Sequence, residues 1–373
     1  MDETLPPSGR GPAYGDGRVY AFGAATMYAT DAKTGELVES FGDGGQLDIS
    51  SKALQFQYPD TYPANFDAYS LGYQLTTPPV YFDNTLFAGV VLSENHIPGG
   101  LVIAADATTG AIKWVFNSMP QGPRNDGWEI VKDTWGDGQK VGGGIWTPPA
   151  IDPELGLVYV NAGNPSPDYD GSARPGMNLF TNATIALDLK TETLAWYYQT
   201  VHHDLWDWDH VTGPILFDVT KDGRVIKGVA MTLFCATYPL IEDPALVERG
   251  RQMYTPYSTT EFVIVLQGGG SWGPPAFSPR TGLLYVTGKN GAVSFTVNPV
   301  GDTLEPGSNN QGQQRRDRRG RLPEHDTDQN CGCLRPRHQR AGLAADGASQ
   351  LPHFEQRQPR DGRRSRVPGH VDR

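Results

Sequence analysis

Short runs that alternate apolar and polar residues recur along the body of the chain and predict β-strands. Such runs surround Leu157–Val160 and Leu283–Val286, and two further apolar runs end at Ala21 and Ala88. Alternation with a period of two is typical of strands that bury one face. No stretch reaches the roughly 18 consecutive apolar residues of a membrane-spanning helix. The pattern therefore predicts an all-β protein.

One motif joins pairs of these predicted strands. The pattern Ala-x-Asp-x-x-Thr-Gly-x-x-x-Trp is complete at Ala104–Trp114, lacks its Gly at Ala186–Trp196, and lacks its Trp at Ala29–Glu39. Asp and Thr side chains bond to nearby backbone, and Gly accepts a positive φ, so the motif predicts a tight turn between two strands. We expect the Trp of the second strand to link one small sheet to the next.

A longer segment occurs twice. Residues Gly142–Val160 return at Gly268–Val286, a constant offset of 126, and 12 of 19 positions are identical. Units of this kind stack because one small sheet cannot bury both of its faces. Closure into a β-propeller leaves only short edges exposed, so the chain is predicted to be a partial propeller of four-stranded blades.

Composition and charge divide the chain near Ser308. Gly (45) and Pro (30) are too abundant for a helical bundle. The net charge is −11, but residues 309–373 contain 14 Arg and no Lys. This apolar-poor tail is predicted to be disordered. Its composition favours an out-of-frame sequence over the alternative, a basic nucleic-acid arm around Arg315–Arg319. We thus expect an incomplete propeller over 1–308, a tail over 309–373, and no nucleic-acid partner.

Cysteine usage and the first residues exclude several classes. The three cysteines, Cys235, Cys331 and Cys333, form neither a disulfide framework nor a complete zinc motif. Residues 1–17 are polar and rich in Pro and Gly, so we expect no signal peptide in this chain.

Three features together resemble the quinoprotein alcohol and sugar dehydrogenases, which depend on pyrroloquinoline quinone (PQQ). They are the Trp-bearing repeat, the run from Gly142 through Gly163–Asp168, and the His203–Asp207 motif. The resemblance covers about residues 8–300. It implies an eight-bladed propeller, PQQ and Ca²⁺ as cofactors, an alcohol or sugar substrate, and a periplasmic location. It also implies a cytochrome c or a membrane quinone as electron acceptor. The family propeller is longer, so the chain is expected to be a fragment.

The resemblance also assigns roles to individual residues. Trp146 matches the indole that stacks on the quinone, and the alternative is that it is only a core residue of its repeat, like Trp272 in the second copy. Asn164 and Glu94 match Ca²⁺ ligands, and oxygen donors suit that cation. Asp204 matches the catalytic base and is also placed at the metal. A carboxylate among indoles is partly desolvated, which raises its pKa toward useful basicity.

Weaker matches concern the cofactor's polar groups. Arg10 falls where the family pairs an Arg with a PQQ carboxylate, a geometry that suits guanidinium. Thr76 and Thr77 are candidate hydroxyl contacts to the same cofactor.

Several alternatives remain open. His202, His203 and His210 lie close to three Asp residues and could form a metal site instead, while Asp207 and Asp209 are interpreted as turn or packing residues. A basic residue expected after Ala230 is missing, and Ser271 replaces an Asn. A non-catalytic propeller scaffold or an inactive fragment is therefore the alternative to the dehydrogenase.

Overall fold

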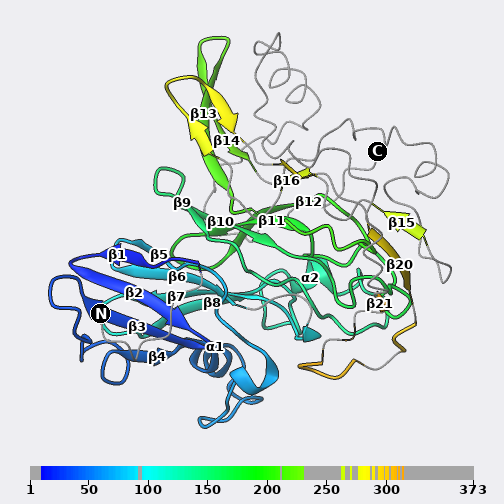
Figure 1. Cartoon of the computed structure of the whole chain (residues 1–373), viewed down its shortest axis with the longest axis horizontal. Helices are drawn as coiled ribbons and strands as arrows, with labels where there is room; N and C mark the ends of the chain where they lie inside the picture. The colour runs from blue at the N-terminus through cyan, green and yellow to red at the C-terminus, as the bar shows by residue number, and fades with distance from the viewer. Residues whose placement is uncertain are drawn as a thin grey trace, which may run out of the picture.

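Figure 1 shows the computed structural model of the chain. The structure describes residues 10–90, 95–210, 212–230, 262–264, 269–270, 276–285, 288–289, 293–297, 299–301, 304–308, 310 and 313–314. Most of the regular structure in these ranges is β-strand, and the larger part of it belongs to three four-stranded antiparallel sheets in which neighbouring strands follow one another along the chain.

We call these sheets the first, second and third blades. The first blade contains β1 (Ala13–Gly15), β2 (Arg18–Gly23), β3 (Thr26–Asp31) and β4 (Gln46–Asp48). The second contains β5 (Val80–Phe82), β6 (Thr85–Val90), β7 (Leu101–Asp106) and β8 (Ile112–Asn117). The third contains β9 (Ala150–Asp152), β10 (Leu157–Ala162), β11 (Ala183–Asp188) and β12 (Leu194–Gln199). The predicted fold class, a partial all-β propeller of four-stranded blades, is confirmed.

The remaining elements lie outside the three blades. The hairpin of β13 (Ile215–Lys221) and β14 (Arg224–Ala230) extends away from the blades at the top of Figure 1. Three further groups of paired strands are β15 (Phe262–Ile264) with β20 (Val293–Val297) and β21 (Gln313–Gln314), β16 (Gly269–Gly270) with β19 (Gly288–Lys289), and β17 (Ala276–Ser278) with β18 (Leu283–Tyr285). The helices are α1 (Ile49–Gln57), the 3-10 turn η1 (Tyr69–Leu71) and α2 (Trp128–Val131).

The duplicated segment forms the same hairpin in both copies. In the third blade Ala150 pairs with Tyr159, and 126 positions later Ala276 pairs with Tyr285. Trp272 and Ser271 of the second copy lie outside the described residues, as do Cys235 and the segment after Ala230.

The predicted turn between the third and fourth strand of each blade has the expected chemistry. In the second blade, Asp106 Oδ1 accepts hydrogen bonds from the backbone N–H groups of Thr108 (3.0 Å) and Thr109 (2.9 Å), and Gly110 has a φ of 76°. Asp31 and Asp188 cap the other two turns in the same way. Local sequence alone therefore fixes this end of each blade.

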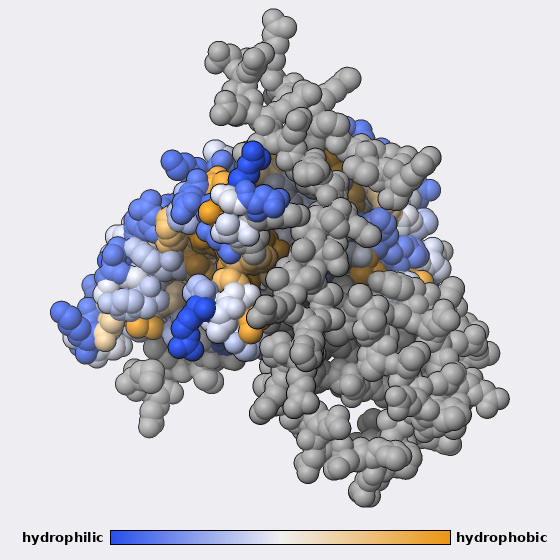
Figure 2. All heavy atoms as spheres, turned by 90° about the horizontal axis from the view of Figure 1, so that it is seen from above, coloured by the Kyte–Doolittle hydropathy of each residue, from blue (hydrophilic) through white to orange (hydrophobic). Residues whose placement is uncertain are grey.

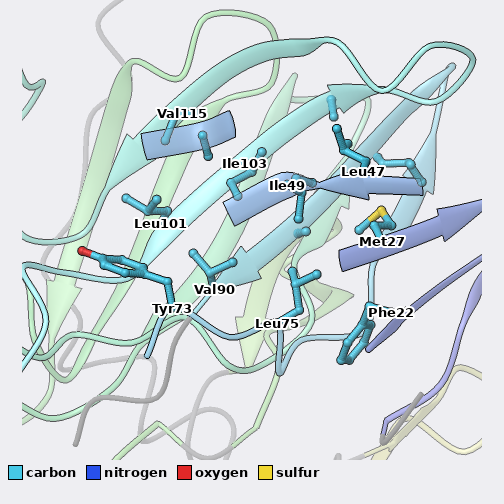
Figure 3. Packing of buried hydrophobic residues seen from close by; sticks show 14 of the residues in the cluster. Phe22, Met27, Leu47, Ile49, Tyr73, Leu75, Val90, Leu101, Ile103 and Val115 are labelled. Carbon is cyan, nitrogen blue, oxygen red and sulfur yellow. The ribbon is translucent and has the colours of Figure 1, made fainter. Parts of the chain in front are cut away.

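The second blade is buried on both faces because it lies between the other two. Ile103 and Val115 belong to the cluster shared with the first blade, whereas Val102 and Phe116 belong to the cluster shared with the third. Figure 3 shows the first cluster, with Met27 and Leu47 facing Ile103 and Leu101. Burial on both faces explains why β6 and β7 are almost continuously apolar, where a half-buried strand would alternate.

Aromatic side chains join the blades as predicted. Trp114 of β8 is buried between the second and third blades, with its indole Nε1 3.4 Å from the carbonyl oxygen of Leu189. The first blade, which has Glu39 at the corresponding position, uses Tyr20 instead. The Tyr20 hydroxyl donates to the carbonyl oxygen of Ala107 at 2.8 Å.

Figure 2 shows one face of the molecule, on which hydrophilic residues of the described part predominate and hydrophobic ones lie between them. None of the helices in the described ranges has the length and apolar character to cross a bilayer. Nearly all of the predicted tail, 309–373, lies outside the described residues, so the division at Ser308 stays a prediction.

Candidate active site

Blade topology brings the predicted site residues to one end of the sheets. In a four-stranded antiparallel meander, the connection between the second and third strands and the connection between blades lie at the same end. We call this the loop end, and the opposite one the turn end. Every described site prediction falls on a loop-end connection; these residues are Arg10, Thr76, Thr77, Trp146, Asn164 and Asp204. Glu94 belongs to the loop after β6 but lies outside the described residues.

Trp146 and Arg10 are in direct contact. The indole is buried, and the Arg10 guanidinium carbon lies 5.1 Å from the ring centroid. Arg10 Nη1 also donates to the carbonyl oxygen of Trp146 at 2.8 Å. Burial lowers the pKa of Arg10, but the group remains a cation at neutral pH. The structure thus places a positive charge at the indole predicted to stack on a planar cofactor.

Glycines at the loop end let backbone segments approach one another. A Cβ on Gly89 would lie 2.3 Å from the carbonyl oxygen of Ile145, and one on Gly100 would lie 2.5 Å from its nitrogen. The Thr77 hydroxyl fixes the same peptide by donating to the Ile145 carbonyl at 2.6 Å. Gly89 and Gly100 thus make room for the backbone of the Trp146 segment. Thr77 is likewise engaged with the protein, whereas Thr76 Oγ1 is buried without a hydrogen-bond partner among the described residues.

Asn164 is a buried polar side chain whose amide nitrogen is held by two acceptors. It is completely buried, and its amide nitrogen donates to Asp168 Oδ1 at 2.5 Å and to the Pro165 carbonyl at 3.1 Å. Its Oδ1 has no hydrogen-bond partner among the described residues. The backbone N–H of Asn164 donates to Asp209 Oδ1 at 2.5 Å. The buried amide oxygen of Asn164 therefore lies in a segment whose backbone is hydrogen-bonded to the Asp209 carboxylate.

Backbone hydrogen bonds tie the three predicted segments together. Gly143 N–H, in the turn before Trp146, donates to the Asn164 carbonyl at 2.8 Å. Gly163 N–H donates to the Gly144 carbonyl at 2.9 Å. Together with the Asn164–Asp209 bond, these contacts make the Trp146 turn, the Asn164 loop and the 204–209 loop neighbours.

Asp204 caps its own loop. It is completely buried, and its Oδ1 accepts from Trp206 N–H at 2.9 Å. Its Oδ2 accepts from Trp208 N–H at 2.8 Å and from Asn182 Nδ2 at 2.9 Å. Burial raises the pKa of Asp204, although these hydrogen bonds and the charge of Arg174 oppose the rise. Both oxygens are thus committed to holding the 204–209 loop.

Two other carboxylates of this loop are more accessible. Asp207 and Asp209 are partly exposed, and they alternate with the buried indoles of Trp206 and Trp208, whose ring centroids are 5.1 Å apart. Asp207 Oδ2 accepts from the Tyr169 hydroxyl at 3.2 Å. The sequence analysis gave both carboxylates a turn or packing role. The alternation of Trp and Asp is the signal that could have shown one carboxylate pair facing away from the core.

A buried arginine balances the acidic residues. Arg174 is 1% exposed, and its Nη2 donates to the carbonyl oxygens of Pro167 (2.7 Å) and Asp204 (2.6 Å). Burial lowers the pKa of Arg174 to about 10, while the nearby carboxylates of Asp204, Asp168 and Asp170 oppose the shift. Nothing in the local sequence marks this arginine as a partner of Asp204, which lies 30 positions away in a separate loop.

The three histidines do not converge. His210 is buried against Thr200, and burial lowers the pKa of His210 to about 3. His203 Nδ1 donates to the Gly176 carbonyl at 2.9 Å, and His202 is exposed. Among the residues that the structure describes, no group of three or more His, Cys, Asp or Glu side chains could hold a metal ion. Asn164, whose donor is an amide oxygen, belongs to another class of ligand.

Comparisons with known proteins identify relatives of this arrangement. The family model for the PQQ glucose/ethanol/alcohol dehydrogenase β-propeller domain matches residues 8–233. The chain is 31% identical over 204 residues to the quinoprotein glucose dehydrogenase of Escherichia coli K12, covering 54% of this chain and 24% of that protein. It is 31% identical over 224 residues to the quinohemoprotein alcohol dehydrogenase ADH-IIG of Pseudomonas putida, covering 50% of this chain and 31% of the relative.

Solved structures give the same fold. The structure of the Pseudomonas putida quinohemoprotein alcohol dehydrogenase matches with a TM-score of 0.60 at 24% identity, covering 80% of this chain and 46% of that one. A europium-containing methanol dehydrogenase matches with a TM-score of 0.59 at 22% identity, covering 80% and 55%. The matched part of the chain spans about a quarter of the length of the first curated relatives.

Proposed function

The chain belongs to the PQQ-dependent family of glucose, ethanol and alcohol dehydrogenase β-propellers, and from that premise we propose that it oxidises a primary alcohol or a sugar or polyol. The observation that supports this proposal is the buried Asn164 Oδ1, which has no partner among the described residues and lies in a segment bonded to a carboxylate. An unsatisfied buried acceptor costs about 1–3 kcal/mol unless a ligand satisfies it.

The donor set fits a hard cation. We assign Asn164 and Asp209 to Ca²⁺, with Glu94 from the loop after β6 as a further ligand. Amide and carboxylate oxygens are the donors that Ca²⁺ prefers. A non-catalytic scaffold would have no use for a buried amide oxygen of this kind, so the geometry favours the dehydrogenase.

The cofactor contacts follow from the same end of the blades. We assign the stacking role to Trp146, the carboxylate contact to Arg10, and a hydroxyl contact to Thr76, whose Oγ1 is buried without a described partner. Thr77 supports the site through Ile145. When bound, PQQ supplies the two-electron oxidant, and the cation supplies a Lewis acid that polarises its carbonyl.

We propose that Asp207 is the base, in place of Asp204. A base must be within hydrogen-bond reach of the substrate hydroxyl. Asp204 is completely buried with both oxygens occupied, whereas Asp207 is partly exposed and held by the Tyr169 hydroxyl. Asp207 would take the hydroxyl proton as the substrate carbon gives up its hydride. Asp204 would hold the loop in which Asp207 lies.

The electron acceptor and the location extend the same proposal. From membership of this family we propose that electrons pass to a cytochrome c or a membrane quinone, and that the protein acts in the periplasm.

Reconstitution tests the function. Purified protein is loaded with PQQ and either Ca²⁺ or Eu³⁺, and dye reduction is measured with ethanol, glucose and glycerol. We expect substrate-dependent reduction that requires both PQQ and a metal ion. Failure to take up PQQ, or reduction that is independent of the metal, would overturn the proposal.

A further inference from the structure

The orientation of the Asn164 amide is set by two acceptors. The oxygen and nitrogen of an amide are similar in size, so hydrogen-bond partners decide which atom points where. Asn164 Nδ2 donates both its hydrogens, to Asp168 Oδ1 and to the Pro165 carbonyl. A flipped amide would place its oxygen against these two acceptors. The stable orientation therefore leaves Oδ1 on the side without a described partner.

We propose that Asp168 is a positioning residue that holds the Asn164 amide with its oxygen presented to a divalent or trivalent cation. This inference rests on the proposed function, and it assigns a role to a carboxylate that is not itself a ligand in the proposed set. Residues that orient a metal ligand typically contribute a factor of about 10–100 to metal affinity.

Asp168 can do this because its own segment is fixed. Arg174 donates to the Pro167 carbonyl through Nε (3.2 Å) and Nη2 (2.7 Å), directly before Asp168. The same guanidinium binds the Asp204 carbonyl at 2.6 Å, at the start of the loop that carries Asp209. The buried guanidinium of Arg174 thus sets the spacing between the loops that hold Asn164 and Asp209.

The charge balance supports a positioning role over simple packing. Asp168 is 3% exposed, and a buried carboxylate is costly unless it is paired and hydrogen-bonded. Hydrogen bonds to a carboxylate are stronger than hydrogen bonds between neutral groups, so a carboxylate at 168 orients the amide more firmly than a neutral acceptor could.

The test compares Ca²⁺ binding by calorimetry in four proteins without PQQ: the unsubstituted chain, Asp168→Asn, the double variant Asn164→Asp/Asp168→Asn, and Asp152→Asn. Asp152 is the matched control, because it is a buried carboxylate of the same blade at the turn end, where it caps the β9–β10 hairpin. Urea unfolding of each variant is measured alongside.

We expect Asp168→Asn to weaken Ca²⁺ binding about 10–100-fold. A neutral amide at 168 accepts the hydrogen bond from Asn164 less strongly than a carboxylate does, and its NH₂ group can also donate to a flipped Asn164. The double variant should recover most of the affinity, since a carboxylate at 164 has two equivalent oxygens and one can accept from the new Asn. Asp152→Asn should bind like the unsubstituted chain.

Two results would overturn the role of Asp168 alone: equal affinity of the unsubstituted chain and Asp168→Asn, or loss without recovery in a double variant that unfolds at the same urea concentration. Absence of Ca²⁺ binding by the unsubstituted chain would instead overturn the proposed metal site, and the role of Asp168 with it.

Discussion

An aspartate at each end of the third blade accepts backbone hydrogen bonds, but the pKa values of the two aspartates shift in opposite directions. At the turn end, Asp188 Oδ1 accepts from the backbone N–H groups of Lys190 and Thr191. At the loop end, Asp204 accepts from those of Trp206 and Trp208. Desolvation is small enough at Asp188 that the hydrogen bonds outweigh it, so the pKa of Asp188 is lowered. Burial dominates at Asp204, and its pKa is raised. The difference in burial, and not in local bonding, distinguishes the candidate site from a turn.

The glycines of the two ends differ in the same way. Gly17 and Gly110, at the turn end, have φ values of 74° and 76°, which an L-residue with a side chain disfavours. Gly89, at the loop end, has no such φ but leaves no space for a Cβ beside Ile145. Turn-end glycines serve backbone conformation, and this loop-end glycine serves packing around the Trp146 segment.

The largest expected effect is on the rate of dye reduction, which should depend on a carboxylate of the loop end and not on one of the turn end. Asp207→Asn should lower the rate of dye reduction by the PQQ- and metal-loaded protein about 100- to 10,000-fold, the usual contribution of a general base. PQQ binding should remain, because the substitution preserves size and the contact with Tyr169. Steady-state kinetics and PQQ fluorescence titration measure the two quantities.

Asp188→Asn is the control at the turn end and should leave the rate unchanged. If Asp207→Asn retains full activity while Asp204→Asn loses it without unfolding, the base is Asp204 and our assignment of the two roles is reversed.

The next prediction concerns the free energy of unfolding. In Asp204→Asn one of the two oxygens becomes an NH₂ group that faces a backbone N–H donor, so about 1.5–3 kcal/mol should be lost at pH 7. Asp188 accepts on Oδ1 from the backbone N–H groups of Lys190 and Thr191 and from the Thr191 hydroxyl. An Asn there keeps this acceptor, so the free energy of unfolding should fall by well under ~1 kcal/mol. Urea unfolding measures both.

The pH dependence of these two variants should differ in sign. The pKa of Asp204 is raised on folding, so the wild type gains stability relative to Asp204→Asn as pH falls through that raised pKa. The pKa of Asp188 is lowered, so its contribution is present above the ordinary value of 3.8 and is lost as pH falls below it. Parallel pH profiles for the two variants would contradict the comparison.

Gly89→Ala should have a smaller effect on stability. Its Cβ would lie 2.3 Å from the Ile145 carbonyl and 2.8 Å from Thr77 Oγ1, so the Trp146 segment must shift, at about 1–3 kcal/mol. PQQ affinity should fall as well. Gly17→Ala, which has open space but a positive φ, should lose about 1 kcal/mol and no PQQ affinity. Equal PQQ affinity in the two variants would show that Gly89 has no role in cofactor binding.

The turn end could be predicted from sequence because its interactions are local. The Asp and Thr of each turn contact residues two or three positions away, so the repeated motif contains all the residues that these turn hydrogen bonds need. The same locality made the four-stranded blades and the linking role of Trp114 predictable. Helix α1, whose N-cap Asp48 accepts from Ser51, was not predicted because it belongs to no repeat.

The loop end could be predicted only in outline. The resemblance placed Trp146 and Asn164 in segments that the structure brings together. It assigned the base and metal roles to Asp204, and left Asp207 and Asp209 as turn or packing residues. The difference between the buried Asp204 and the more accessible Asp207 and Asp209 depends on how the loop packs and on Arg174. This arginine donates to the Asp204 carbonyl from 30 positions away. Contacts of that range leave no periodic pattern in the sequence.

The smallest expected effect is a gain of stability at the turn end. Glu192 occupies the position of Gly35 and Gly110 and has a φ of 56°. A left-handed conformation costs an L-residue roughly 1–2 kcal/mol. Replacement by Gly removes this cost, but the greater conformational entropy of Gly in the unfolded chain offsets part of the gain. Burial also raises the pKa of Glu192, with help from Asp126 and Asp188, so the carboxylate is unfavourable there. Glu192→Gly should therefore stabilise the fold by up to about 1 kcal/mol in urea unfolding, with Ca²⁺ and PQQ binding unchanged. A destabilised Glu192→Gly would mean that the third turn is held by side-chain contacts and not by the backbone geometry it shares with the other two.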